Sequence, residues 1–117
     1  MADYRRDLSK ETCEGLLQGR GKDRYACKVV PSIRATLVDQ YDGDIHIRYQ
    51  DTDVVVFKAD GTIVLSSGGW HTTTTKSRIN AALSGTGWYL YQKNYNWFVS
   101  NGKVNITFTD GMEVASE

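Results

Sequence analysis

Cysteine, histidine and long apolar runs are scarce in this sequence, and each shortage excludes a class of protein. The two cysteines, Cys13 and Cys27, form no CxxC pair and no disulfide framework, so we expect two reduced thiols. The two histidines, His46 and His71, have no metal-ligand spacing, so neither a zinc site nor a bound cofactor is predicted. No apolar run approaches the length of a membrane span or the h-region of a signal sequence, which predicts a cytoplasmic protein without a membrane partner.

Acidic residues are missing from one half of the chain. The formal charges cancel, with 14 basic and 14 acidic residues, which argues against a basic or acidic tail. Between residues 61 and 109 there is no Asp or Glu, whereas there are four bases, Lys76, Arg78, Lys93 and Lys103. Six acids lie between residues 39 and 60, in an order that misses a calcium-binding loop, and we interpret them as solvated turn residues: Asp39, Asp42, Asp44, Asp51, Asp53 and Asp60.

The apolar pattern from residue 33 onward is typical of β-strands. Apolar and polar residues alternate, and four Asx-Gly pairs, at residues 42–43, 60–61, 101–102 and 110–111, predict tight turns in an antiparallel meander. We therefore expect one α+β domain over residues 1–117, mostly an antiparallel sheet or a small barrel or roll of about six strands. The residues predicted to face inward are Ile33, Ala35, Leu37, Ile45, Ile47, Tyr49, Val104, Ile106 and Phe108, and the run Val54–Phe57 is predicted to be a central strand covered on both faces.

Two helices are predicted. One covers residues 9–18 with Ser9 as its N-cap, within an N-terminal arm of residues 1–35 that precedes a β-rich core of residues 36–117. The other covers residues 75–84, begins after Thr74 or Thr75 as its cap, and ends at Gly85. Its apolar residues share one face, as expected of a helix that packs on a sheet: Ile79, Ala82 and Leu83.

The segment GGWHTTTTKSRIN, residues 68–80, is the predicted ligand site. Lys76 and Arg78 are predicted in the first turn of the helix, where their positive charge is repelled by the positive end of the macrodipole. A phosphate or carboxylate bound there would offset this repulsion. The predicted ligand-binding residues are Gly68, Gly69, Trp70, Thr72, Thr73, Thr74, Thr75, Lys76, Ser77 and Arg78. The order of a P-loop is absent, so nucleotide hydrolysis is not predicted. The alternative is that Lys76 and Arg78 point to solvent or pair with the acids of residues 39–60.

Aromatic residues give a second candidate surface. In the strand GWYLYQK, alternation puts Trp88 and Leu90 on one face and Tyr89, Tyr91 and Lys93 on the other. If the first face is core, the second presents two tyrosines beside a lysine, on which nucleic-acid bases could stack. The alternative is that these tyrosines are ordinary cross-strand packing partners.

The second half of the chain resembles small bacteriophage proteins of unassigned function that share a GGW-x-T-x-TTK-x-RIN core. The resemblance covers residues 54–112 and rests on Val55-x-Phe57, Asp60-Gly61, Ile63-x-Leu65, Ser67-Gly68-Gly69-Trp70-x-Thr72, Thr74-Thr75-Lys76-x-Arg78-Ile79-Asn80, Tyr91-Gln92-Lys93, Trp97-Phe98 and Phe108-x-Asp110-Gly111-Met112. It implies a small accessory protein made in a bacterial host cell, of the kind that serves host takeover or counter-defence by binding rather than by chemistry.

No catalytic constellation is predicted, because His71 has neither a positioned acid nor a nucleophile motif beside it. We therefore expect a non-enzymatic protein that captures a phosphate-bearing ligand, a nucleotide-like signal or a nucleic-acid backbone, at residues 68–80. The alternative is an inhibitor that binds a host protein through the sheet surface and the acidic loops. The sequence leaves the oligomeric state open, a homo-oligomer included.

Overall fold

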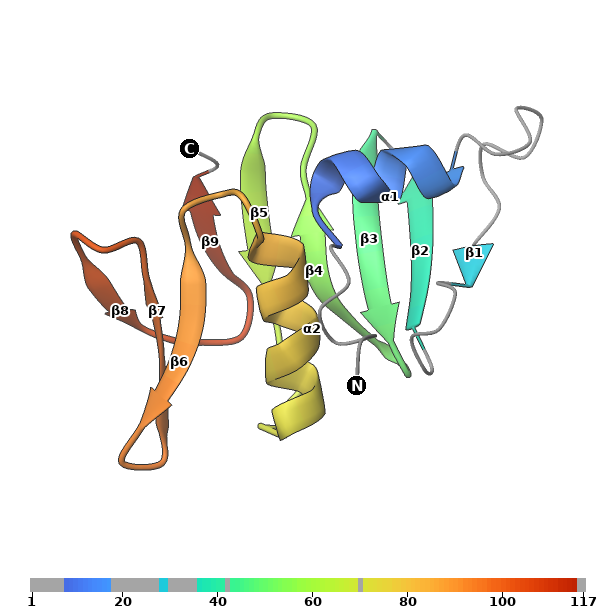
Figure 1. The fold of residues 1–117 in the computed structure, drawn as a ribbon. Helices are drawn as coiled ribbons and strands as arrows, with labels where there is room; N and C mark the ends of the chain where they lie inside the picture. The colour runs from blue at the N-terminus through green and yellow to red at the C-terminus, as the bar shows by residue number, and fades with distance from the viewer. Residues whose placement is uncertain (1–7, 18–27, 30–35, 42, 70, 116–117) are drawn as a thin grey trace.

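A computed structural model describes residues 8–17, 28–29, 36–41, 43–69 and 71–115 of the chain, which form two open antiparallel sheets and two helices (Figure 1). The six-stranded sheet has the order β1-β2-β3-β4-β5-β9 and the three-stranded sheet the order β6-β7-β8. The helices are α1 (Lys10–Leu17) and α2 (Thr73–Leu83), and the strands are β1 (Lys28–Val29), β2 (Thr36–Tyr41), β3 (Asp44–Tyr49), β4 (Thr52–Phe57), β5 (Thr62–Leu65), β6 (Tyr89–Lys93), β7 (Asn96–Ser100), β8 (Asn105–Thr107) and β9 (Met112–Ala115). The predicted α+β class is confirmed, but the sheets do not close into a barrel.

The middle of the six-stranded sheet follows the predicted alternation only in part, because His46, a polar position of the pattern, is buried and Tyr49, predicted to face inward, is half-buried. Ile45 and Ile47 of β3 are buried, and β4 is an interior strand in which Val54, Val55 and Phe57 are buried. Strand β2 differs from the prediction, because Thr36 and Val38 are its buried residues and Leu37 is only half-buried. Ile33 and Ala35, the other residues predicted to face inward there, lie outside the described residues.

The last strands leave the predicted meander. Gly43, Gly61, Gly102 and Gly111 all have positive φ, as the Asx-Gly pairs predicted. However, the turn at residues 110–111 does not form a hairpin, because β9 crosses back to pair with β5. Val104 and Ile106 were predicted to face inward but are 47% and 39% exposed, since β8 is the outer strand of the small sheet and only Phe108, beyond its end, is buried.

Both predicted helices form. Helix α1 follows Ser9, whose Oγ accepts a hydrogen bond from the Thr12 N–H at 3.5 Å, and the buried Cys13 thiol donates to the Leu8 carbonyl at 3.4 Å. Helix α2 begins two residues earlier than predicted, because Thr72, not Thr74 or Thr75, is the N-cap. Gly85 follows the helix with a φ of 84°, as predicted. Cys27 and the end of the predicted N-terminal arm lie outside the described residues.

Helix α2 lies between the two sheets and is hydrogen-bonded to both (Figure 1). The apolar residues predicted for its buried face, Ile79, Ala82 and Leu83, are all buried. On one side Arg78 reaches β2, and on the other Asn80 is bonded to the backbone of β6. The helix therefore fixes the three-stranded sheet relative to the rest of the molecule.

Candidate functional site

The two bases of the predicted anion site point to different sheets. Lys76 Nζ donates to Gln92 Oε1 in β6 at 3.2 Å. Arg78 is buried, its Nε donates to Thr36 Oγ1 in β2 at 3.0 Å, and its guanidinium lies 5.3 Å from the centre of the Tyr49 ring. The early start of α2 also moves Arg78 out of the first helical turn, where the prediction had placed it. The structure therefore does not bring the two charges together around one ligand.

The glycines before the helix serve the packing of the chain. Gly68 has a φ of 66°, and a Cβ at this position would collide with the side chain of Thr52. Gly69 is exposed, and its N–H donates to Ser67 Oγ at 3.1 Å. Both the N–H and the hydroxyl of Ser67 donate to Asp110 Oδ1 at 2.7 Å, which joins this loop to the turn before β9. Trp70, predicted as a stacking residue, lies outside the described residues.

The hydrogen bonds around Asp110 change its acidity. Partial burial alone would raise the pKa of this carboxyl group. The hydrogen bonds from the N–H and hydroxyl of Ser67 and from the Gly69 N–H, together with the nearby His71, outweigh burial and lower the pKa. His71 itself stacks on Trp97, with 4.4 Å between the ring centres, and contacts Phe108 edge-on. Ser67 is thus tied to the turn before β9, and His71 to the small sheet.

The threonines of residues 72–75 have separate roles. Thr72 Oγ1 accepts a hydrogen bond from the Thr75 N–H at 3.1 Å and donates to Thr75 Oγ1 at 3.0 Å, so this pair forms the helix cap. Thr73 is exposed, and Thr74 and Ser77 are half-buried. Thr72 and Thr75 also line a pocket.

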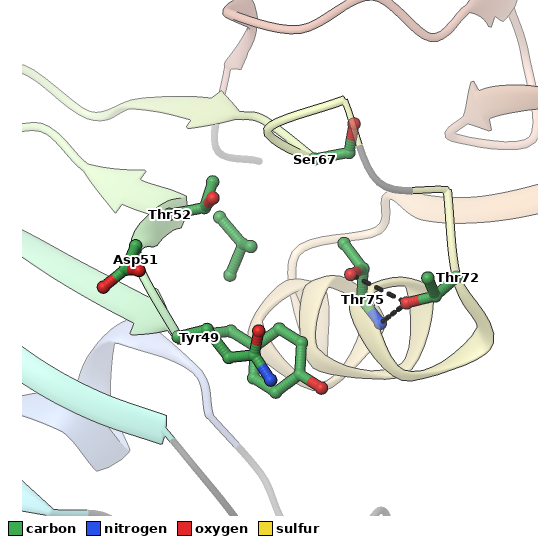
Figure 2. A pocket seen from close by; sticks show the side chains of 8 residues that line it. Tyr49, Asp51, Thr52, Ser67, Thr72 and Thr75 are labelled. Atoms are coloured by element: carbon green, nitrogen blue, oxygen red, sulfur yellow. Dashed lines mark hydrogen bonds between the residues drawn. The ribbon is translucent and has the colours of Figure 1, made fainter.

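That pocket, of about 410 Å³, lies between the β3–β4 turn and the beginning of α2 (Figure 2). Asp51 is the only charged residue among the described residues of its lining, and none of these is a base that could bind a phosphate. Gln50 has a φ of 57°, an uncommon conformation for a residue other than glycine. The lining residues are Tyr49, Gln50, Asp51, Thr52, Val54, Ser67, Thr72 and Thr75.

The second predicted surface is assembled on the outer face of the three-stranded sheet. Tyr89 is 47% exposed, and its ring centre lies 5.9 Å from that of Tyr91. Tyr91 stacks on its cross-strand partner Phe98 in β7, with 5.5 Å between the ring centres. The Tyr91 hydroxyl donates to Asn105 Oδ1 at 2.8 Å. Lys93 is exposed and, two residues further along β6, shares this face. We call Tyr89, Tyr91, Lys93 and Phe98 the tyrosine face.

The tyrosine face combines a packed ring with two exposed side chains. Tyr91 is a cross-strand packing partner, because it stacks on Phe98 and is half-buried. Tyr89 and Lys93, in contrast, are exposed on the same face. Phe98 was not among the predicted residues, but alternation in its strand separates it from the buried Trp97 and Val99 and indicates the outer face, where it pairs with Tyr91.

Tyr95 is not among the residues predicted for this surface. It is 91% exposed in the turn between β6 and β7, where Asn94 has a φ of 52° and Tyr95 a φ of 70°. Two-residue turns of this kind strongly favour glycine, because a side chain at positive φ crowds the backbone. An aromatic residue that is both strained and almost fully exposed is typical of a contact site.

No helix in the described residues is long and apolar enough to cross a membrane. No curated protein and no solved structure matches the chain. A family model for the Kyanoviridae Gp96 protein, a phage protein, matches residues 9–115 of the 117. Nearly the whole chain is covered, and it therefore belongs to the Kyanoviridae Gp96 family of bacteriophage proteins.

Proposed function

We propose that this phage protein binds single-stranded nucleic acid on the tyrosine face and acts by binding rather than by catalysis. The phosphate-bearing ligand expected from the sequence is retained, but its place moves from residues 68–80 to the three-stranded sheet. One observation carries the proposal: the exposed ring of Tyr89 contacts the half-buried ring of Tyr91 beside a lysine, in a part of the chain that has no carboxylate.

The rings suit unpaired bases. Each base has a π-face, and stacking on an aromatic side chain contributes about 1–3 kcal/mol per base regardless of sequence. Tyr89 lies near one end of β6 and Lys93 is its last residue, so the five residues of this strand span about 15 Å, room for a few nucleotides. Tyr91 is held in place by Asn105 and Phe98, so ordering its ring on binding costs little entropy.

Charge supports the same partner. Residues 61–109 contain no Asp or Glu, so no carboxylate of the three-stranded sheet or of α2 repels a phosphate. Lys93 lies at the β6–β7 end of the small sheet, and Lys103 lies at the opposite end, between β7 and β8. A strand of nucleic acid that follows β6 would pass a lysine at each end of its path.

A single strand fits this surface better than a duplex. Sheets with exposed aromatic residues recognise bases that are splayed out of a helix, whereas duplex recognition requires an element that enters a groove. Helix α2, the longer of the two described helices, is occupied between the sheets. In the infected cell such a protein would serve host takeover or counter-defence from the cytoplasm.

The acidic loops give less support to the alternative, an inhibitor of a host protein. Asp44 accepts the Ala59 N–H at 2.9 Å, Asp60 accepts the Thr62 N–H at 2.9 Å, and Asp53 pairs with Arg48 at 2.8 Å. These carboxylates hold turns and neighbouring strands of the fold, which accounts for their presence without a partner.

The test is fluorescence anisotropy with labelled DNA and RNA oligonucleotides at several salt concentrations. We expect Tyr89→Ser to weaken binding of single strands by about tenfold, because one stacked base is lost. We expect Lys93→Ala with Lys103→Ala to reduce the slope of log K against log salt by about 1.4, about 0.7 for each phosphate contact. Lys10→Ala, an exposed lysine on α1, the helix that packs on β2 and β3 of the larger sheet, is the control and should leave the slope unchanged.

Binding that is equally strong in wild type and in all of these variants would contradict the proposal. Binding of a host protein through residues 39–60, with no affinity for oligonucleotides, would replace it with the inhibitor alternative.

A further inference from the structure

We propose that the pocket between the β3–β4 turn and the beginning of α2 binds a small neutral ligand that carries vicinal hydroxyl groups, such as a pentose. This site is separate from the tyrosine face, and nothing in the proposal depends on nucleic-acid binding there. Figure 2 shows Asp51 and Thr52 on the hairpin side of the pocket, with Thr72 and Thr75 across from them at the start of the helix.

Some of the hydroxyl groups that line the pocket already donate hydrogen bonds within the protein. The Ser67 hydroxyl donates to Asp110 Oδ1, and the Thr72 hydroxyl donates to Thr75 Oγ1. Thr75 accepts that hydrogen bond and keeps its own proton, since a hydroxyl group can donate once and accept twice. The committed bonds fix the wall of the pocket on the helix side.

Other lining groups are available to a ligand. Among the described residues, the side chains of Gln50, Asp51 and Thr52 make no hydrogen bond or ion pair. Gln50 offers a donor and an acceptor, and Thr52 offers both on one hydroxyl. In Figure 2 the Asp51 carboxylate is turned away from α2, and rotation of this exposed side chain brings its two acceptor oxygens to the pocket. The hairpin side of the pocket therefore presents an unused set of mixed donors and acceptors.

This set selects the class of ligand. A carboxylate with two oxygens can accept from two adjacent hydroxyl groups, which is how acidic residues hold a ribose diol in dinucleotide-binding folds. A phosphate is disfavoured, because the one charged side chain among the described lining residues is the carboxylate of Asp51. An amine would use only the acceptors, whereas a diol also satisfies the donors of Gln50 and Thr75.

Size and conformation agree with a ligand site. A volume of about 410 Å³ lies in the range of small-molecule pockets, roughly 300–1,000 Å³. Tyr49 is fixed beside the pocket by the Arg78 guanidinium, 5.3 Å from its ring centre. Gln50 keeps a φ of 57° at the turn, where glycine would fit without strain, so its side chain rather than its backbone accounts for its presence.

A free sugar and a ribonucleoside share the diol, and the experiment separates them. The probes are D-ribose, adenosine and 2′,3′-dideoxyadenosine, titrated into the full chain labelled with ¹⁵N. We expect adenosine or ribose at about 10 mM or below to shift the amide signals of Gln50, Asp51 and Thr72, and dideoxyadenosine to have no effect. Ribose alone would identify a sugar site, and adenosine with little effect of ribose would identify a nucleoside site.

Two variants sharpen the result. Asp51→Asn keeps the shape of the side chain and removes one acceptor and the charge, so we expect at least about tenfold weaker binding of the diol. Glu113→Gln removes an exposed carboxylate on β9, away from the pocket, and should bind as wild type does. Both variants should give wild-type spectra without ligand, which establishes that they are folded. Absence of shifts with both diols, or equal binding of dideoxyadenosine, would overturn the proposal.

Discussion

The side-chain amide of Asn80 exchanges two hydrogen bonds with the backbone of Leu90, as a neighbouring β-strand would. Asn80 Nδ2 donates to the Leu90 carbonyl at 2.9 Å, and the Leu90 N–H donates to Asn80 Oδ1 at 2.7 Å. Strand β6 is an edge strand, so these bonds satisfy backbone groups that have no partner strand. Arg78 is hydrogen-bonded to Thr36 of β2, and Lys76 to Gln92 of β6. These bonds and those of Asn80 explain the segment TTKSRIN as the connection between the two sheets.

Replacing Asn80 should therefore loosen the small sheet. We expect Asn80→Ala to lower the free energy of unfolding by about 1–3 kcal/mol, because the Leu90 N–H and carbonyl lose their partners. Urea denaturation measures the loss, and amide exchange at Leu90 should become faster. Asn96→Ala, an exposed residue at the start of β7, is the matched control. An unchanged midpoint for Asn80→Ala would show that water replaces the two hydrogen bonds of Asn80 without loss of stability.

Thr72 should be the threonine of the run on which helix stability depends most. Removing its Oγ1 leaves the Thr75 N–H without its cap, so we expect Thr72→Ala to destabilise the protein by about 1 kcal/mol. Thr73→Ala removes an exposed hydroxyl one residue later and should have little effect. Thermal denaturation of the two variants compares them directly, and equal losses would argue against Thr72 as the cap.

The positive φ of Tyr95 should lower the stability of the folded protein. We expect Tyr95→Gly to raise the free energy of unfolding by roughly 0.5–1 kcal/mol, because glycine adopts a φ of 70° without strain. Asn94→Gly should gain less, since asparagine tolerates this conformation better than tyrosine. If the exposed ring contacts nucleic acid, Tyr95→Gly should also weaken oligonucleotide binding. If Tyr95→Gly is more stable and binds oligonucleotides as wild type does, the strained conformation of Tyr95 is not required for binding.

Asp110 should make stability depend on pH in the acidic range. Its pKa in the folded protein lies below the ordinary value of 3.8, so the unfolded chain binds a proton more readily than the folded one. Its contribution is therefore complete above the ordinary pKa and is lost as the pH falls through the lowered one. Unfolding midpoints measured from about pH 5 to pH 2 should fall less steeply for Asp110→Asn than for wild type. Parallel curves would contradict this account of the carboxyl group.

Features set by neighbouring residues could be predicted from the sequence. The inward side chains of Ile45 and Ile47, the turns at Gly61 and Gly102, and the end of α2 at Gly85 all follow from local periodicity and from the conformations that glycine permits. The face shared by Tyr89 and Lys93 follows from strand alternation in the same way.

Features set by distant residues could not be predicted. The return of β9 to β5 depends on a pairing of Ile63 with Val114, about fifty residues apart, for which no local pattern gives a signal. The burial of Arg78 depends on Thr36 and Tyr49, which are distant in the sequence, so the local pattern indicated an anion-binding group instead. The turn at Asn94–Tyr95 lacks the glycine by which such turns are identified.

The most direct test of nucleic-acid binding by the tyrosine face is a map of the contact surface. A short single-stranded oligonucleotide is titrated into ¹⁵N-labelled protein, and amide shifts are recorded for every described strand. We expect the shifts to be concentrated on β6, β7 and β8, with Tyr89, Tyr91 and Tyr95 among the largest, and to be absent from β2–β4. Shifts concentrated on the acidic strands and turns of residues 39–60, or no shifts at about 0.1 mM oligonucleotide, would contradict the account.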